Sequence, residues 1–255
     1  DPNGPMEVSL SALLPAGAQP VGVAVSPEGQ RYVLDRLSGL YELGPDGAKL
    51  VWKTSELASR YGQRADLDLT DIVALGSEQF AITAENDGFR LDLHGGTFSS
   101  YFCYLPSLPA EPVVVPLSIS QTLQLQGIEV RQRTESVAFS PGGQLLFAQP
   151  QTFRMDTGAV AGSELFIFRA TGGEPIQIRT IPETTFVATG MVAVGEDRLL
   201  LGNGHSLYEV TATTGPFLVK DLAEAIQIAG LARQPNGDLL VLDRAGNRLL
   251  RVPSP

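Results

Sequence analysis

The sequence predicts an all-β protein built from repeated four-stranded units, and three observations carry this prediction. Residues 21–43 and 228–252 are near copies from opposite ends of the chain. Each contains an apolar run, a Pro-x-Gly turn, a run that ends in Leu-Asp-Arg, a second turn and a third apolar run. The 27 glycines and 18 prolines are spread along the chain, which is typical of many short strands joined by turns. A chain of 255 residues with 43% hydrophobic residues can bury a large core in a single domain.

Five starts of this repeat are recognisable, at residues 21, 70, 134, 189 and 229. Successive starts are 40 to 64 residues apart, which is the size of a four-stranded propeller blade. The first strand of the first unit is apolar on both faces, as expected for a strand buried between neighbouring blades. We therefore predict a single β-propeller of five blades. Six blades are the alternative, because the surplus strand-like runs at 107–131 either add a hairpin to the second blade or form a blade of their own.

The two ends of the chain are expected to meet. The last repeat ends at Val252 with only three strands, whereas a propeller blade has four. Residues 6–14 alternate weakly between apolar and polar and have no local partner. We therefore expect residues 6–14 to complete the last blade and close the ring, so that 1–5 is a flexible tether and 6–255 is the propeller domain.

Charge and composition exclude several classes of function. The net charge of −10, from 28 acidic and 18 basic residues, repels phosphate backbones and argues against a nucleic-acid partner. No run of about 18 apolar residues is present, so we expect no transmembrane segment. The single cysteine, Cys103, excludes an internal disulfide and any paired-cysteine metal site. No nucleophile elbow or phosphate-binding glycine motif occurs. As for the oligomeric state, we expect a monomer.

The start of the chain bears on localisation. The sequence begins at Asp1 without a methionine, and Asp-Pro-Asn-Gly-Pro is typical of a flexible tether. A secreted, periplasmic or lipid-anchored protein whose signal had been removed would begin in this way. The predominance of arginine over lysine is associated with GC-rich bacteria, so we expect a bacterial protein. Together with the tether, this makes a bacterial lipoprotein one expectation. A single cysteine is equally compatible with the cytoplasm.

A polar residue ends the second strand of every repeat when the repeats are superimposed. These residues are Asp35, Glu85, Gln149, Asn203 and Asp243. Equivalent positions surround the axis of a propeller, so these side chains could form a belt of oxygen ligands for a hard cation such as Ca²⁺. The alternative is local, because Asp and Asn at such turns cap their own backbone.

A second set of residues directly precedes the first strand of each repeat. It consists of Val21, Thr70, Glu135, Thr189 and Ala229. Only Glu135 is charged, and a carboxylate at the mouth of a channel is costly to desolvate without a cation, a donor or water. The alternative is an exposed glutamate at a loop end. The candidate metal ligands are therefore Asp35, Glu85, Glu135 and Asp243, and the candidate ligand-binding or channel residues are Glu135, Gln149 and Asn203.

Two stretches resemble known families. Residues 22–29, GVAVSPEG, followed by Tyr-Val-Leu-Asp at 32–35, resemble the repeat shared by NHL, gluconolactonase-like and related bacterial propellers. Residues 134–148, with 163–168 after a long loop, are similar to the esterase-like phytase family, whose Glu-Gly start is matched by Glu135-Ser136. This second resemblance implies metal-dependent hydrolysis, although the other repeats lack the acidic residue.

Two functions are compatible with these observations. The first is an extracytoplasmic, non-catalytic propeller that binds a protein or a small ligand on one face of the ring. The alternative is a divalent-metal-dependent hydrolase acting on a phosphoester, ester or lactone, with Glu135 and the second-strand residues as metal ligands and a metal-bound water as nucleophile. The shortage of paired acidic residues favours the binding module, and whether the protein is an enzyme stays open.

Overall fold

The computed structural model describes residues 7–55, 69–84, 87–92, 99–100, 123–125, 128–154, 157, 160–169, 176–181, 188–211 and 213–253. Strands make up most of these ranges, together with one short 3-10 helix, η1 (Leu10–Ala12). Within the described residues, no helix is long and apolar enough to cross a membrane.

The described strands form five antiparallel sheets. Sheet 1 contains β2 (Pro20–Val25), β3 (Arg31–Asp35), β4 (Gly39–Gly44) and β5 (Gly47–Lys53). Sheet 2 contains β6 (Leu69–Ala74), β7 (Gln79–Ala84), β8 (Asp87–Asp92) and β9 (Ser99–Ser100). Sheet 3 has five strands, in the order β10 (Leu123–Leu125), β11 (Ile128–Phe139), β12 (Leu145–Arg154), β13 (Val160–Arg169) and β14 (Gln177–Ile181). Sheet 4 contains β15 (Met191–Ala193), β16 (Arg198–Asn203), β17 (Ser206–Thr211) and β18 (Phe217–Asp221). Sheet 5 contains β19 (Ile228–Arg233), β20 (Leu239–Asp243), β21 (Arg248–Val252) and, outermost, β1 (Glu7–Ser9).

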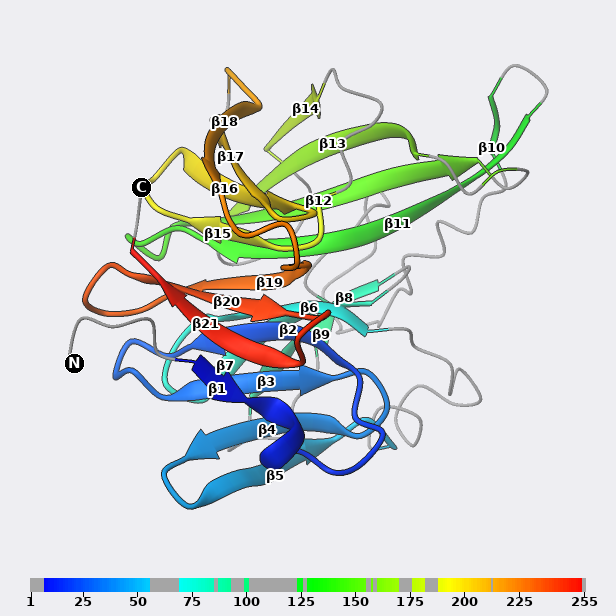
Figure 1. Ribbon diagram of the computed structural model, residues 1–255. Coiled ribbons are helices and arrows are strands. Elements are labelled where there is room, and N and C mark those ends of the chain that lie inside the picture. The colour runs from blue at the N-terminus through cyan, green and yellow to red at the C-terminus, as the bar shows by residue number, and fades with distance from the viewer. Residues whose placement is uncertain are drawn as a thin grey trace.

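The first long strand of each sheet lies at the centre of the molecule. β2 contacts β6, β6 contacts β11, β11 contacts β15, β15 contacts β19, and β19 contacts β2. Figure 1 shows these strands gathered in the middle, with β5, β14 and β18 towards the periphery. The predicted all-β propeller is confirmed by this arrangement.

Apolar side chains fill the space between each sheet and the next. Between sheets 1 and 2, for example, Tyr32 and Phe80 meet edge to face with ring centroids 4.8 Å apart. Separate buried clusters join sheets 2 and 3, 3 and 4, 4 and 5, and 5 and 1. β2 and β19 are therefore covered on both faces, which is why their sequences are apolar without alternation.

The start of the chain lies against its end. β1 pairs with β21 in antiparallel register, with Val8 opposite Leu249, and Figure 1 shows the two strands side by side. The expected strand over residues 6–14 is too long, because the strand ends at Ser9 and a 3-10 turn follows. Leu10, in this turn, and Leu14, just after it, are both buried in the core between sheets 5 and 1.

The surplus run at 107–131 is described only at 123–125 and 128–131. These residues form a hairpin of β10 with the start of β11. They extend sheet 3 rather than forming a sheet of their own. The added hairpin was expected on the second blade, so its placement there was wrong for these residues, because β10 pairs with the start of β11.

Candidate functional site

Each inner strand carries an irregularity within it or just before it. In β2, β6, β11 and β19 the pairing with the second strand shifts by one residue. In sheet 4, both Thr189 and Gly190 bond to the backbone of Gly202, which gives the same two-against-one pattern. The extra residues are Val21, Thr70, Glu135, Thr189 and Ala229. They are the residues that the sequence placed before each inner strand, and they are β-bulges, which re-aim neighbouring side chains.

The residue after each bulge forms a ring around the molecular axis. This axial ring consists of Gly22, Asp71, Ser136, Gly190 and Gly230. A Cβ at Gly22 would lie 3.0 Å from the Ile72 nitrogen, and one at Gly230 would lie 3.1 Å from the Val23 nitrogen. A Cβ at Gly190 would lie 2.8 Å from the Cα of Gly230. Sheets 1, 4 and 5 thus approach their neighbours so closely that a Cβ at any of these positions would require the neighbouring strand to move.

Asp71 is the charged member of the axial ring. Its side chain is buried, with 1% of the residue exposed. Oδ1 accepts a hydrogen bond from the Ile72 N–H at 2.9 Å, and Oδ2 accepts one from the Val137 N–H of sheet 3 at 3.1 Å. The Val137 N–H is equivalent to the nitrogens that approach the glycines elsewhere in the ring. The carboxyl group therefore fills the space between sheets 2 and 3. At the glycine positions of sheets 1, 4 and 5, the backbone of the next sheet occupies the equivalent space.

The environment of Asp71 disfavours its negative charge. Burial raises its pKa well above the usual range, against the lowering effect of the N–H groups of Val137 and Ile72. Glu135, the half-buried bulge residue of β11, raises the pKa of Asp71 further. Two acidic side chains from adjacent sheets are therefore coupled at one end of the ring axis.

Buried polar side chains lie behind the ring in sheets 2 and 3. Thr83, opposite Asp71, accepts a hydrogen bond from the Thr70 hydroxyl at 2.8 Å. Gln149, opposite Ser136, accepts from the Ser136 hydroxyl at 3.2 Å and donates from Nε2 to Ser163 at 2.7 Å. We call this set the central polar cluster: Thr70, Asp71, Thr83, Glu135, Ser136, Gln149 and Ser163. The corresponding second-strand residues of sheets 1 and 5 are Leu34 and Leu242.

The belt predicted at the ends of the second strands is not one row of equivalent residues. Asp35 and Asp243 lie opposite the residue before the bulge, as Pro150 does in sheet 3. Gln149 belongs one residue earlier, in the row of Leu34, and successive side chains of a strand point to opposite faces. The superposition had aligned polar residues instead of the bulges. Half-buried Asn203 ends β16 opposite Ser206, and Glu85 lies outside the described residues.

Asp35 is a turn cap. Its Oδ1 accepts hydrogen bonds from the backbone of Leu37 at 3.1 Å and of Ser38 at 2.8 Å, and from the Ser38 hydroxyl. Its Oδ2 accepts one from the Gln19 N–H. This is the local alternative drawn from the sequence.

Asp243 does the same in sheet 5. Oδ1 accepts from the N–H groups of Gln227 at 2.9 Å and Ala245 at 3.1 Å, and Oδ2 accepts from Nε of Arg248 at 2.8 Å. Burial acts to raise its pKa, but these donors outweigh burial and the pKa is lowered. Within the described part of the chain, no three His, Cys, Asp or Glu side chains are grouped closely enough to hold a metal ion.

Asp71 was not among the residues singled out from the sequence. A signal for it does exist, because Asp71 occupies the position of Gly22 and Gly230 in the repeat alignment. A charged residue in a glycine position of an otherwise apolar strand is the kind of local inconsistency that marks functional sites.

No protein-family model matches this sequence, and no curated protein matches it either. Among solved structures, a streptogramin B lyase is similar over 97% of this chain and 97% of its own, with a TM-score of 0.51 and 10% sequence identity. A protein designated a gluconolactonase is similar over 100% of this chain and 83% of its own, with a TM-score of 0.54 and 14% identity. These likenesses concern the fold, and they confirm the resemblance to gluconolactonase-like propellers at that level.

Proposed function

We propose that this chain is a binding module that holds a polar ligand, or a polar group of a partner protein, at the Glu135 end of the ring axis. The observation that carries the proposal is the buried carboxyl group of Asp71, coupled to Glu135 across two sheets. Buried charge is destabilising unless it is compensated, and strongly perturbed carboxyl groups gather at functional sites. A cationic or donor-rich ligand group next to Glu135 would supply that compensation.

The rest of the proposed architecture follows from the pairing of the chain ends. We take sheet 3, with its added strand, as the fifth blade of a closed ring. The pairing of β1 with β21 supports this closure, as do the five inter-sheet clusters. The module is proposed to be monomeric and extracytoplasmic, as a secreted, periplasmic or lipid-anchored bacterial protein. Detection in a membrane or periplasmic fraction of the native cell would test the location.

The second candidate function is a divalent-metal-dependent hydrolase of phosphoesters, esters or lactones. It is favoured by one observation, the proximity of two carboxyl groups to the hydroxyl and amide oxygens of the central polar cluster. Oxygen donors suit Ca²⁺, which takes about six to eight of them. Because Asp35 and Asp243 cap turns, Asp71 and Glu135 replace them as the proposed ligands. A bound divalent cation would supply Lewis acidity and a nucleophilic water.

Two measurements separate these functions. A thermal-shift screen of polar and cationic compounds should give hits that lose about tenfold in affinity, or about 1.4 kcal/mol, in Glu135→Gln. The control Asp46→Asn removes an exposed charge in sheet 1 and should leave the same hits unchanged. Equal binding by Glu135→Gln would contradict the proposed site.

The same assay with Ca²⁺ and with EDTA tests the hydrolase. A ligand that binds only the folded state raises its melting temperature by mass action. A rise with Ca²⁺ in the parent protein that is lost in Glu135→Gln would favour the metal-dependent function. No response to Ca²⁺ or EDTA would leave the binding module as the function.

A further inference from the structure

A cavity opens on the ring axis at the end opposite Glu135. The final residues of β2, β6, β11, β15 and β19, with the turns that follow β2, β11 and β19, line about 540 Å³ of space. The bulge of each inner strand precedes the residues of that strand that line the cavity, so the cavity and the central polar cluster lie towards opposite ends of the axis. We call this cavity the distal pocket. Its volume is in the range of cavities that hold drug-sized ligands.

The walls of the distal pocket are apolar and incompletely covered. Val25, Val73, Leu75 and Phe139 line it, and each is only half-buried. Leu231 and Met191, which also line it, are almost fully buried. An apolar ligand body would remove the half-buried side chains from water, which is the main source of affinity in such cavities.

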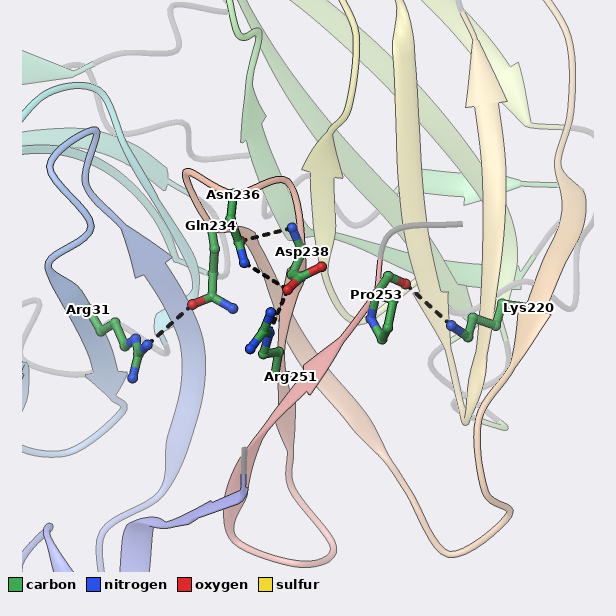
Figure 2. Close-up of polar contacts among 7 residues, drawn as sticks. All are labelled: Arg31, Lys220, Gln234, Asn236, Asp238, Arg251 and Pro253. Carbon is green, nitrogen blue, oxygen red and sulfur yellow. Dashed lines mark hydrogen bonds and ion pairs between the residues drawn. The ribbon is translucent and has the colours of Figure 1, made fainter. Parts of the chain in front are cut away.

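The rim of the distal pocket is braced by contacts between sheets. Glu28 accepts a hydrogen bond from the Ser77 hydroxyl at 2.7 Å, joining sheets 1 and 2. Glu196 accepts one from the Gly142 N–H at 2.7 Å, joining sheets 4 and 3. Gln234 accepts one from Nη2 of Arg31 at 3.3 Å, joining sheets 5 and 1 (Figure 2). A pocket that is already formed loses little conformational freedom when it binds a ligand.

The turn after β19 brings two hydrogen-bond donors to this rim. Arg31 can only donate, so the side-chain oxygen of Gln234 must face it, and the nitrogen of Gln234 points away from Arg31 in Figure 2. That nitrogen, Nε2, is buried and has no hydrogen-bond partner within the described structure. The neighbouring Arg233 also lines the pocket and is exposed. A buried donor without a partner destabilises the free protein, so an acceptor group of a ligand would be stabilising there.

We infer that the distal pocket binds a ligand with an apolar body and one anionic group, such as a carboxylate or a sulfonate. The apolar body lies against Val73 and Phe139, and the anion accepts hydrogen bonds from Arg233 and Gln234. The carboxylates of Glu28 and Glu196 repel an anion, which confines the charged group to the turn after β19. This site does not depend on the function proposed for the opposite end of the axis.

The test uses two fluorescent probes that differ in one charged group. 8-Anilinonaphthalene-1-sulfonate carries a sulfonate, and N-phenyl-1-naphthylamine has the same aromatic body without it. Both are titrated into the folded protein at neutral pH, with near-ultraviolet circular dichroism as the check on folding. Arg233→Gln should weaken sulfonate-probe binding by about tenfold and change the neutral probe by less than about twofold. Arg244→Gln, which removes an exposed charge at the opposite end of sheet 5, is the matched control and should change neither.

A second pair of variants tests the apolar walls. Val73→Phe fills the distal pocket and should weaken both probes together, and Val25→Phe does so from a different sheet if the first variant fails to fold. The inference is overturned if Arg233→Gln binds the sulfonate probe as the parent does, or if Arg244→Gln loses as much. It is also overturned if a folded filling variant binds both probes unchanged.

Discussion

The axial ring has two sides of different construction. Sheets 1, 4 and 5 contribute glycine, and their strands approach one another within the reach of a single Cβ atom. Sheets 2 and 3 contribute Asp71 and Ser136, with buried Thr83 and Gln149 behind them. The glycine side is therefore held by close backbone packing and apolar contacts. The polar side combines an apolar cluster with hydrogen bonds made by buried side chains, including one from the Val137 N–H to Asp71 between sheets 2 and 3. Close packing leaves no room for chemistry, and a polar interior is costly to keep without a use. This contrast supports the proposal that the ligand binds on the polar side.

Removing the first strand should damage the glycine side most. Sheet 5 takes its outermost strand from the start of the chain, and Leu10 and Leu14 are buried with it. Deleting residues 1–14 exposes their apolar neighbours and the edge of β21, so the protein should aggregate or melt at least about 10 °C lower. Deletion of residues 1–5 is the control, with no change expected. If the long deletion had the same melting temperature as the full chain, the argument that β1 closes the ring would be lost.

The close approach of glycine-side strands can be tested with one methyl group. Gly190→Ala places a Cβ 2.8 Å from the backbone of Gly230, and backbone cannot rotate out of the way as a side chain can. We expect a loss of about 2–4 kcal/mol in the free energy of unfolding, measured with urea. Gly76→Ala is the control, since its nearest neighbour would be 3.9 Å away. A Gly190→Ala variant as stable as the parent would show that the glycine side has room.

On the polar side, the hydrogen-bonded chain should matter more than side-chain volume. Gln149→Leu fills the same space but leaves the buried hydroxyls of Ser136 and Ser163 without their partner. Its free energy of unfolding should fall by about 1–3 kcal/mol. Leucine is the natural residue at the equivalent Leu34 of sheet 1. A Gln149→Leu variant as stable as the parent would therefore mean that these side-chain hydrogen bonds do not stabilise the polar side.

The last prediction concerns the dependence of stability on pH. The folded protein raises the pKa of Asp71 above its unfolded value of about 3.9, because burial disfavours the charge. Between those two pKa values the native state binds more protons than the unfolded state. The contribution of Asp71 to stability is therefore full below about pH 4 and is lost as pH rises through the raised pKa. The loss is about 1.4 kcal/mol for each pH unit that separates the folded and unfolded pKa values.

Asp71→Asn should flatten this part of the pH profile. Urea unfolding from pH 4 to pH 8 would show a smaller decline in stability for the variant than for the parent. Asp46→Asn, on an exposed turn, should keep the parent profile. Parallel profiles for the parent and Asp71→Asn would mean that the buried carboxyl group does not titrate in this range.

Much of the fold could be predicted because the relevant signals are local. The run at residues 21–25 became β2 and the Leu-Asp ending at Asp35 became the end of β3, since turn chemistry and apolar runs determine short strands. The extent of the first strand could not be predicted, because it depends on how Leu10 and Leu14 pack into the core between sheets 5 and 1. The candidate site was predictable only at Glu135. Asp71 and the register of Gln149 depend on the bulges, which exist only once two strands have paired.

By itself, the sequence determined that this protein is a set of repeated β-meanders whose inner strands are buried on both faces. Hydrophobic period and turn residues act over a few neighbours and are visible in one dimension. Only the tertiary structure decided which residues meet on the axis. It brings Asp71 to the Val137 N–H from 66 positions away, and it sets Gly22 beside sheet 2 and Gly230 beside sheet 1. The physical reason is that a shift of one residue in register turns every side chain of a strand to the opposite face, and register is a property of the assembled ring.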